Sequence, residues 1–157
     1  MTATMESAPV RKSIVVQASQ TKAFDVFTGS FGRWWPASYS VGKSALKSAM
    51  IEPRAGGRWY EIGEDGGQCD WGEVLAWEPP ARILLAWRIG ADWRYDPTLL
   101  TEVEVRFIPL GTQSTRVELE HRLLGNMGEA EVAARQTFES EHGWSGILGS
   151  YAALLKT

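Results

Sequence analysis

The chain has 157 residues, of which 44% are apolar and 22% are charged, and its net charge at pH 7 is −3. This composition is ordinary for one soluble globular domain, and it gives no support to nucleic-acid binding, which usually shows as a basic patch. Cys69 is the only cysteine, so an intrachain disulfide and a cysteine-based zinc site are excluded.

The N-terminal part of the chain predicts a strand followed by a helix. Residues 1–9 are expected to form a disordered tail, and residues 10–18 alternate between apolar and polar side chains as a strand does. Ser19 can cap a helix, and Gly29 is expected to break it. Three phenylalanines at spacings of three and four share one face of this helix: Phe24, Phe27 and Phe31.

The middle of the chain predicts a series of short strands joined by turns. Residues 38–47 have no clear period and are expected to form a loop. Four strands follow, at residues 49–53, 57–62, 68–78 and 82–89. Asp65-Gly66 is a hairpin signal, and Pro79-Pro80 is expected to turn the last two of these strands.

Two more strands, at residues 100–109 and 114–123, alternate cleanly. In the first, Val103, Val105 and Phe107 share a face, and charged side chains occupy the other. In the second, apolar residues again alternate with arginine and glutamate. This pattern is typical of an antiparallel sheet with one face in water.

Residues 129–156 have a helical pattern. Four apolar residues recur at spacings of four, three and four: Trp144, Leu148, Tyr151 and Leu155. One continuous helix here would be roughly 40 Å long. The three glycines within it, Gly143, Gly146 and Gly149, each cost about 1 kcal/mol relative to alanine. The order of elements predicts an α+β fold in which a sheet wraps around a long final helix, as one domain at residues 10–157.

Five motifs occur in the order seen in one protein group. They are EPRAGGRWYE at 52–61, WGEVLAWEPPARILLAW at 71–87, TEVEVRF at 101–107, TRVELEHR at 115–122 and GWSGIL at 143–148. With these motifs the chain resembles the START-like (SRPBCC) superfamily, in the branch named after the C-terminal domain of the activator of heat-shock protein 90 ATPase. The resemblance implies a helix-grip fold, with a curved seven-stranded antiparallel sheet around the C-terminal helix and a cavity between them. It departs at Leu123-Leu124-Gly125-Asn126, where relatives often carry a glycine and an aromatic residue.

The eight tryptophans indicate an aromatic core or an aromatic-lined pocket. Apolar walls with a few polar groups are usual in sites for small molecules. The apolar candidates for such a site are Trp34, Trp35, Trp59, Trp87, Phe107, Trp144 and Leu148. Trp87 shares the parity of Ile83 and Leu85 and is the best candidate to face the cavity.

Two ionisable residues are candidates to orient a ligand. His121 follows Val117 and Leu119 in parity, so it is expected to point inward, as a ligand contact or as a structural histidine at the end of a strand. Glu141 is expected on the helical face of Trp144, although a carboxylate there is more often solvated. Glu73 lies between Trp71 and Leu75 in parity, so it is either a buried carboxylate in the cavity or, if twist or a bulge turns it outward, a surface residue, and the surface position is favoured.

No cofactor and no metal are expected, because two histidines and one cysteine leave too few of the usual ligands. The leading hypothesis is a non-enzymatic protein that binds a small apolar or aromatic molecule. The alternatives are a module that contacts a chaperone and a cyclase- or hydrolase-type enzyme that uses the same cavity. No apolar run approaches the roughly 20 residues of a membrane span, and the N-terminus has no signal-peptide core, so we expect a cytoplasmic protein without membrane contact. A homodimer is also an expectation, since cyclic dimers are the commonest homo-oligomers.

Overall fold

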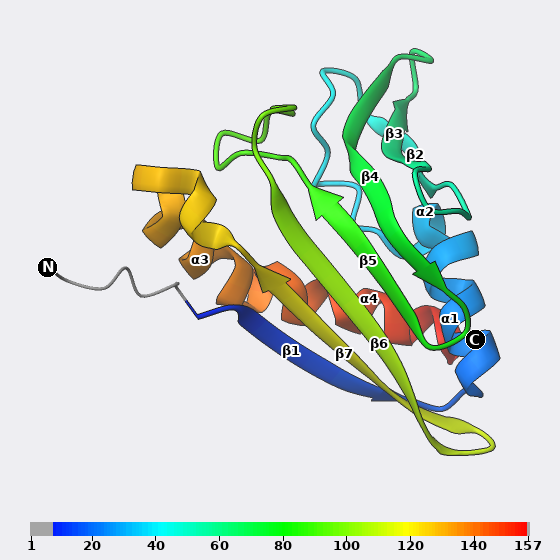
Figure 1. The fold of residues 1–157 in the computed structure, drawn as a ribbon. Coiled ribbons are helices and arrows are strands. Elements are labelled where there is room, and N and C mark those ends of the chain that lie inside the picture. The colour runs from blue at the N-terminus through cyan, green and yellow to red at the C-terminus, as the bar shows by residue number, and fades with distance from the viewer. Residues whose placement is uncertain (1–7, 157) are drawn as a thin grey trace, which may run out of the picture.

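The computed structural model describes residues 8–156, so most of the predicted N-terminal tail lies outside the described residues. Figure 1 shows the arrangement of the elements. The first half of the chain forms β1 (Val10–Val16), α1 (Gln20–Gly29), α2 (Phe31–Trp34), β2 (Leu46–Ile51), β3 (Arg58–Gly63) and β4 (Gln68–Glu78). The second half forms β5 (Arg82–Trp87), β6 (Thr101–Gly111), β7 (Ser114–Arg122), η1 (Leu124–Ala130), α3 (Glu131–Glu139), η2 (Glu141–Ser145) and α4 (Gly146–Leu155).

The strands form one seven-stranded antiparallel sheet in the order β1-β7-β6-β5-β4-β3-β2. The sheet curls around α4, which lies across its concave face (Figure 1). The predicted α+β helix-grip fold is therefore confirmed. The turn at Pro79-Pro80 between β4 and β5 and the hairpin at Asp65-Gly66 between β3 and β4 are both present, with Gly66 at a φ of +85°.

Several strand ends differ from those predicted because pairing, rather than alternation, sets them. β2 begins at Leu46, inside the predicted loop, because Leu46 pairs with Gly63 of β3. The predicted first strand extends to residue 18, but β1 ends at Val16, where its pairing with Thr115 of β7 also ends. β5 ends at Trp87, two residues earlier than predicted.

The helices α1 and α2 divide where the glycines predict a break. Ser19 caps α1 by accepting a hydrogen bond from the amide of Lys22 at 3.2 Å. α2 lies against β2, and a Cβ at Gly32 would meet the carbonyl oxygen of Ala49 at 2.8 Å. Glycine thus allows this close approach. The three phenylalanines expected to share one face are all buried: Phe24, Phe27 and Phe31.

The C-terminal helical region is not one continuous helix, contrary to the pattern-based expectation. It divides into η1, α3, η2 and α4, with a kink at Gly143 (φ −89°, ψ −138°). A Cβ at Gly143 would collide with the carbonyl oxygens of Thr137 and Phe138. The kink therefore depends on glycine, and it turns α3 away from the axis of α4.

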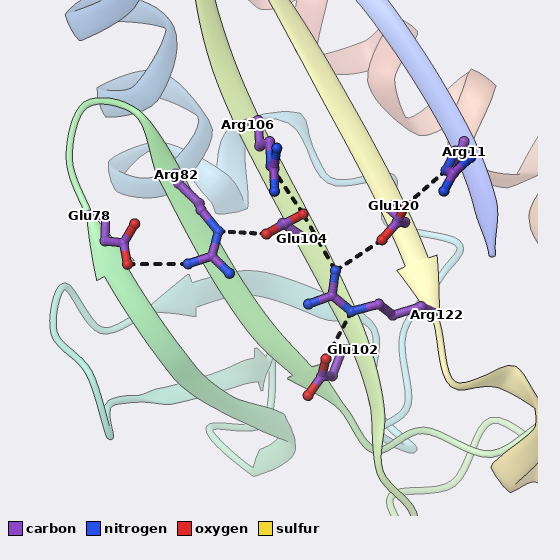
Figure 2. Close-up of polar contacts among 8 residues, drawn as sticks. All are labelled: Arg11, Glu78, Arg82, Glu102, Glu104, Arg106, Glu120 and Arg122. Carbon is purple, nitrogen blue, oxygen red and sulfur yellow. Dashed lines mark hydrogen bonds and ion pairs between the residues drawn. The ribbon is translucent and has the colours of Figure 1, made fainter.

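The outer face of the sheet carries a network of ion pairs (Figure 2). At its centre lies Glu104 of β6, with 7% of its side chain exposed. Three arginines donate hydrogen bonds to this carboxylate: Arg82 at 2.5 Å, Arg106 at 3.1 Å and Arg122 at 3.4 Å. Burial by itself would raise the pKa of Glu104, but the bonds from Arg82 and Arg106 outweigh it and hold that pKa below its ordinary value.

Within residues 8–156, no helix is long and apolar enough to cross a membrane.

Candidate functional site

Much of the space between the sheet and α4 is filled by aromatic side chains. The candidates that lie in this packed core are Trp34, Trp35, Trp59, Phe107 and Leu148, each at most 5% exposed. The ring centroid of Trp35 lies 5.0 Å from that of Trp71, and the ring of Trp59 lies 5.6 Å from that of Trp87. These distances are those of ordinary aromatic pairs, so the five residues contribute to the core.

A surface pocket of about 410 Å³ opens at one end of this core. Its apolar walls are Tyr39, Trp87, Trp93, Phe138, Trp144 and Ile147, and we call it the aromatic pocket. Ser38, Ser40, Thr137 and His142 add polar groups to its lining. A smaller hollow of about 70 Å³ shares Trp87, Trp93, Thr137 and Phe138 with it. The pocket thus lies between the end of β5, the loops that carry Tyr39 and Trp93, and the junction of α3 with α4.

Tyr39 is held in place by hydrogen bonds at both its side chain and its main chain. Its hydroxyl donates to the carbonyl oxygen of His142 at 2.5 Å. Its own carbonyl oxygen accepts a bond from the indole N–H of Trp35 at 2.9 Å. Tyr39 therefore connects the loop after α2 to the α3–α4 junction.

The loop that carries Tyr39 is also tied to the sheet by a buried carboxylate. Glu61 of β3, which is 1% exposed, accepts hydrogen bonds from the amides of Val41 at 2.5 Å and Gly42 at 3.1 Å. It also accepts a bond from the indole N–H of Trp71 at 2.8 Å. These bonds satisfy the carboxylate, as burial of a charged group requires, and position this wall of the pocket.

Trp93 lies in the loop between β5 and β6 with a φ of +58°. A tryptophan in this left-handed region is uncommon, because the Cβ crowds the backbone. The base of the loop is held by Arg88, which donates hydrogen bonds to the carbonyl oxygens of Pro97 and Leu99 at 3.2 Å each. Arg88 is in turn paired with Glu73 at 2.6 Å, and Glu73 is not among the residues that line the pocket.

His121 is fully buried behind the pocket wall and does not line the pocket. Its Nδ1 accepts a hydrogen bond from the indole N–H of Trp144 at 3.1 Å. Nε2 therefore carries the proton of the neutral ring and donates to Thr101 Oγ1, 2.9 Å away, which itself donates to the carbonyl oxygen of Trp87 at 2.7 Å. Burial lowers the pKa of His121 to about 3, so the ring is neutral at pH 7.

Glu141 does not share the buried face of Trp144, and this expectation is wrong. The kink at Gly143 changes the helical phase between the two residues. As a result Glu141 is exposed while Trp144 is 2% exposed. His142 lines the pocket instead.

Other hollows on the surface are less suited to an apolar ligand. One of about 430 Å³ lies over the ion-pair network on the outer face of the sheet, where Arg122 is bonded to Glu102 at 2.9 Å. Another, of about 690 Å³, follows α1, α2 and β2 and includes the charged residues Asp25, Arg33 and Lys47. A third, of about 850 Å³, is lined by polar residues that include Lys43, Gln68 and Arg94.

Of the predicted site residues, the structure places Trp87 and Trp144 in the pocket wall. Three further residues of the pocket wall were not predicted from the sequence: Tyr39, Trp93 and Phe138. Tyr39 and Trp93 lie in segments without periodicity, so no alternation could show their direction. The one available signal was the presence of large aromatic side chains in polar loops.

The comparisons place this chain and its fold among known proteins. The family model described as Activator of Hsp90 ATPase homolog 1-like protein matches residues 17–156. Among solved structures, an anthrahydroquino-gamma-pyrone synthase, Txn09, complexed with SUM, is 37% identical with a TM-score of 0.67, over 95% of this chain and 97% of that chain. A comparison with curated proteins found no match.

A second solved structure that is similar over its whole length is CalC, a self-sacrificing resistance protein from Micromonospora echinospora. It is 31% identical with a TM-score of 0.71, over 95% of this chain and 94% of that chain. Protein MLL2253 from Mesorhizobium loti, at 21% identity and a TM-score of 0.63 over 94% of this chain and 96% of that chain, shares the fold. The chain therefore belongs to the family of Activator of Hsp90 ATPase homolog 1-like proteins, within the START-like superfamily.

Proposed function

We propose that this protein binds a small, largely apolar or aromatic molecule in the aromatic pocket. The observation that carries the proposal is the lining of this pocket, where the side chains of Trp87, Trp93, Phe138 and Trp144 meet around about 410 Å³. Sites for small molecules typically have volumes of about 300–1,000 Å³, apolar walls and a few polar groups. The pocket has all three properties.

The polar groups of the pocket lie where they can orient a ligand. Ser38, Ser40 and His142 line it together with the aromatic side chains. These side chains can donate or accept hydrogen bonds to a ligand. The indole N–H groups of Trp87 and Trp144 cannot do so, because they already donate to the carbonyl oxygen of Ile89 and to Nδ1 of His121. Specificity for a ligand would thus come from the shape of the pocket and from these rim groups.

The relatives support a ligand of this kind. One is a synthase whose name describes a fused aromatic product, and its structure is complexed with SUM. A START-like fold fits a ligand-binding protein, and the identity of 37% extends along nearly the whole chain. The two ionisable residues predicted from the sequence do not line this pocket, since His121 is buried behind its wall and Glu141 is exposed outside it.

The proposal is tested by titration with 1,8-dihydroxyanthraquinone, a flat three-ring probe. We expect quenching of tryptophan fluorescence and a rise of the melting temperature with probe concentration, because a ligand that binds only the folded state stabilises it. Thr137→Trp should block the pocket, since the exposed Thr137 side chain lies at its wall. We expect this variant to lose probe binding about tenfold or more.

The matched control is Gln136→Trp, which adds the same side chain one position away on the exposed surface of α3. This variant should bind the probe as the wild type does. If the wild type shows neither quenching nor a melting shift, the proposed function is wrong. Equal binding by both variants would place the probe elsewhere and would also contradict the proposal.

A further inference from the structure

Two rings at the mouth of the aromatic pocket face each other in parallel. The ring planes of Tyr39 and Trp93 are inclined by only 11°, and their centroids lie 6.1 Å apart. The contacts of Trp87 with Trp93, Phe138 and Trp144 have inclinations between 67° and 87°, and the rings of Phe138 and Trp144 are inclined by 32° to each other. The Tyr39–Trp93 pair is thus arranged differently from the surrounding aromatic side chains.

The two rings belong to separate loops, and each loop is anchored away from the rings. Glu61 holds the loop of Tyr39 through the amides of Val41 and Gly42. Arg88 holds the loop of Trp93 through two carbonyl oxygens. The orientation of the rings is therefore established without a ligand, and such preorganisation reduces the entropy that binding must overcome.

Trp93 is not explained by its contribution to the core. Its side chain is only half-buried, yet the residue adopts a φ of +58°, which is unfavourable for a bulky side chain. Strained residues of this kind cluster at ligand sites, where the surrounding structure maintains them. In this conformation the indole lines the aromatic pocket and the adjoining hollow of about 70 Å³.

We propose that Tyr39 and Trp93 are specificity-determining residues that stack on the two faces of one flat aromatic ring of the ligand. A ring between two others needs about 7 Å between the outer centroids, from two contacts of about 3.5 Å. The two centroids lie 6.1 Å apart, about 1 Å less than this value, so the two rings must move apart when the ligand ring enters. The inference rests on the proposed function and narrows its ligand class to planar aromatic molecules.

The test compares two probes with the same carbon skeleton and one hydroxyl group each. 2-Naphthol is flat and aromatic, and decahydro-2-naphthol is its saturated, puckered analogue. Transfer from water into an apolar pocket favours the binding of both probes. Only 2-naphthol can also stack on the rings of Tyr39 and Trp93. By NMR titration, we expect the wild type to bind 2-naphthol about tenfold more tightly than the saturated analogue, as two stacking contacts permit.

Removal of either ring should reduce this selectivity while apolar binding remains. In Trp93→Leu and in Tyr39→Leu, we expect the ratio of the two affinities to fall to about three, because one of the two stacking contacts is left. Tyr39→Phe keeps the ring and should keep the ratio. Trp77→Leu is the control, since Trp77 is a half-buried tryptophan that lines the groove beside α1 rather than the aromatic pocket.

The outcomes separate this inference from the proposed function. If both probes bind the wild type equally, or if the wild-type ratio is unchanged in Trp93→Leu and Tyr39→Leu, the stacking role is overturned while the binding function stands. If neither probe nor the three-ring anthraquinone binds the wild type, the proposed function falls and the stacking role falls with it. A reduced ratio in both leucine variants, with the wild-type ratio retained in Tyr39→Phe and Trp77→Leu, supports the proposal.

Discussion

The indole N–H of Trp144 donates a hydrogen bond to Nδ1 of His121 over 3.1 Å, and this contact joins the α3–α4 junction to β7. An indole can only donate, so the contact requires an unprotonated Nδ1 and fixes the tautomer of the buried ring. The bonds continue through Thr101 to the carbonyl oxygen of Trp87. Both tryptophans in this chain of bonds line the aromatic pocket, so His121 supports the pocket wall as a positioning residue.

Removal of the donor should destabilise the protein more than the loss of indole volume does. Trp144→Phe leaves the buried Nδ1 of His121 without its partner, and an unsatisfied buried group costs about 1–3 kcal/mol. Trp59→Phe is the matched control, because Trp59 is equally buried and its Nε1 has no hydrogen-bond partner among the described residues. Urea unfolding should show Trp144→Phe to be less stable by about this amount. Equal stabilities would contradict the role of the bond.

Burial of His121 predicts a loss of stability in mild acid. Its pKa is about 3 in the folded state, below the ordinary value of 6.5, so between these values the unfolded state binds more protons. The contribution of neutral His121 to the free energy of unfolding is complete above pH 6.5, and it falls as the pH decreases from 6.5 toward 3. From pH 6.5 to pH 5 we expect a loss of about 2 kcal/mol in the free energy of unfolding.

The pH effect is assigned by comparing two histidine variants in urea unfolding at pH 6.5 and pH 5. His121→Asn should be less stable overall, but the stability change between the two pH values should be much smaller than in the wild type. His142→Asn removes a histidine with an exposed side chain and serves as control. A wild-type slope that persists in His121→Asn would mean that other groups cause the acid sensitivity.

Glu104 should contribute more to the stability of the protein than Glu102, which lies two positions away on β6. Glu104→Gln removes the charge that three arginines share on the outer face, and loss of one partner from a buried ion pair costs about 3–5 kcal/mol. Because Arg106 is 58% exposed, we expect a smaller cost of about 1–3 kcal/mol. Glu102→Gln, which loses only the bond from Arg122, should cost less than about 1 kcal/mol by thermal unfolding. Equal effects would be evidence against a central role for Glu104.

Gly72 of β4 should not tolerate a side chain. A Cβ at this position would collide with the carbonyl oxygen of Ala86 on β5. We expect Gly72→Ala to destabilise the protein by about 3 kcal/mol, because β4 and β5 must move apart. Gly111→Ala at the exposed end of β6, where a Cβ would meet nothing within 4 Å, should change stability by less than about 0.5 kcal/mol. Denaturant unfolding of both variants compares the two positions directly.

Short-range patterns correctly predicted most of the sheet. The alternation of Val103, Val105 and Phe107 with charged residues identified the inner face of β6, and all three are at most 1% exposed. The same argument placed His121 inward, where it is fully buried. Successive side chains of a strand point to opposite faces of the sheet whichever strands lie beside it, so such predictions do not depend on strand order.

The candidate site was predicted only in part, because it depends on contacts between distant segments. Trp87 and Trp144 were identified by their parity and helical phase. Tyr39 and Trp93 lie 54 positions apart in loops, and nothing in either loop indicates that the two rings lie parallel to each other. The prediction for Glu141 was wrong because it assumed one regular helix through Glu141 and Trp144, whereas the chain is kinked at Gly143 between them.

The amino-acid sequence by itself determined the antiparallel strands, the helical C-terminal region, the aromatic interior and the family. These features follow from local periodicity and from motifs in a characteristic order, which require no knowledge of distant contacts. Only the tertiary structure decided that most of the tryptophans fill the core, that His121 is a neutral support, and that a pocket opens between two loops and a helical kink. The conformations of the two loops depend on packing and hydrogen bonds between segments far apart in the sequence, such as the bonds from Val41 and Gly42 to Glu61, which local patterns do not show.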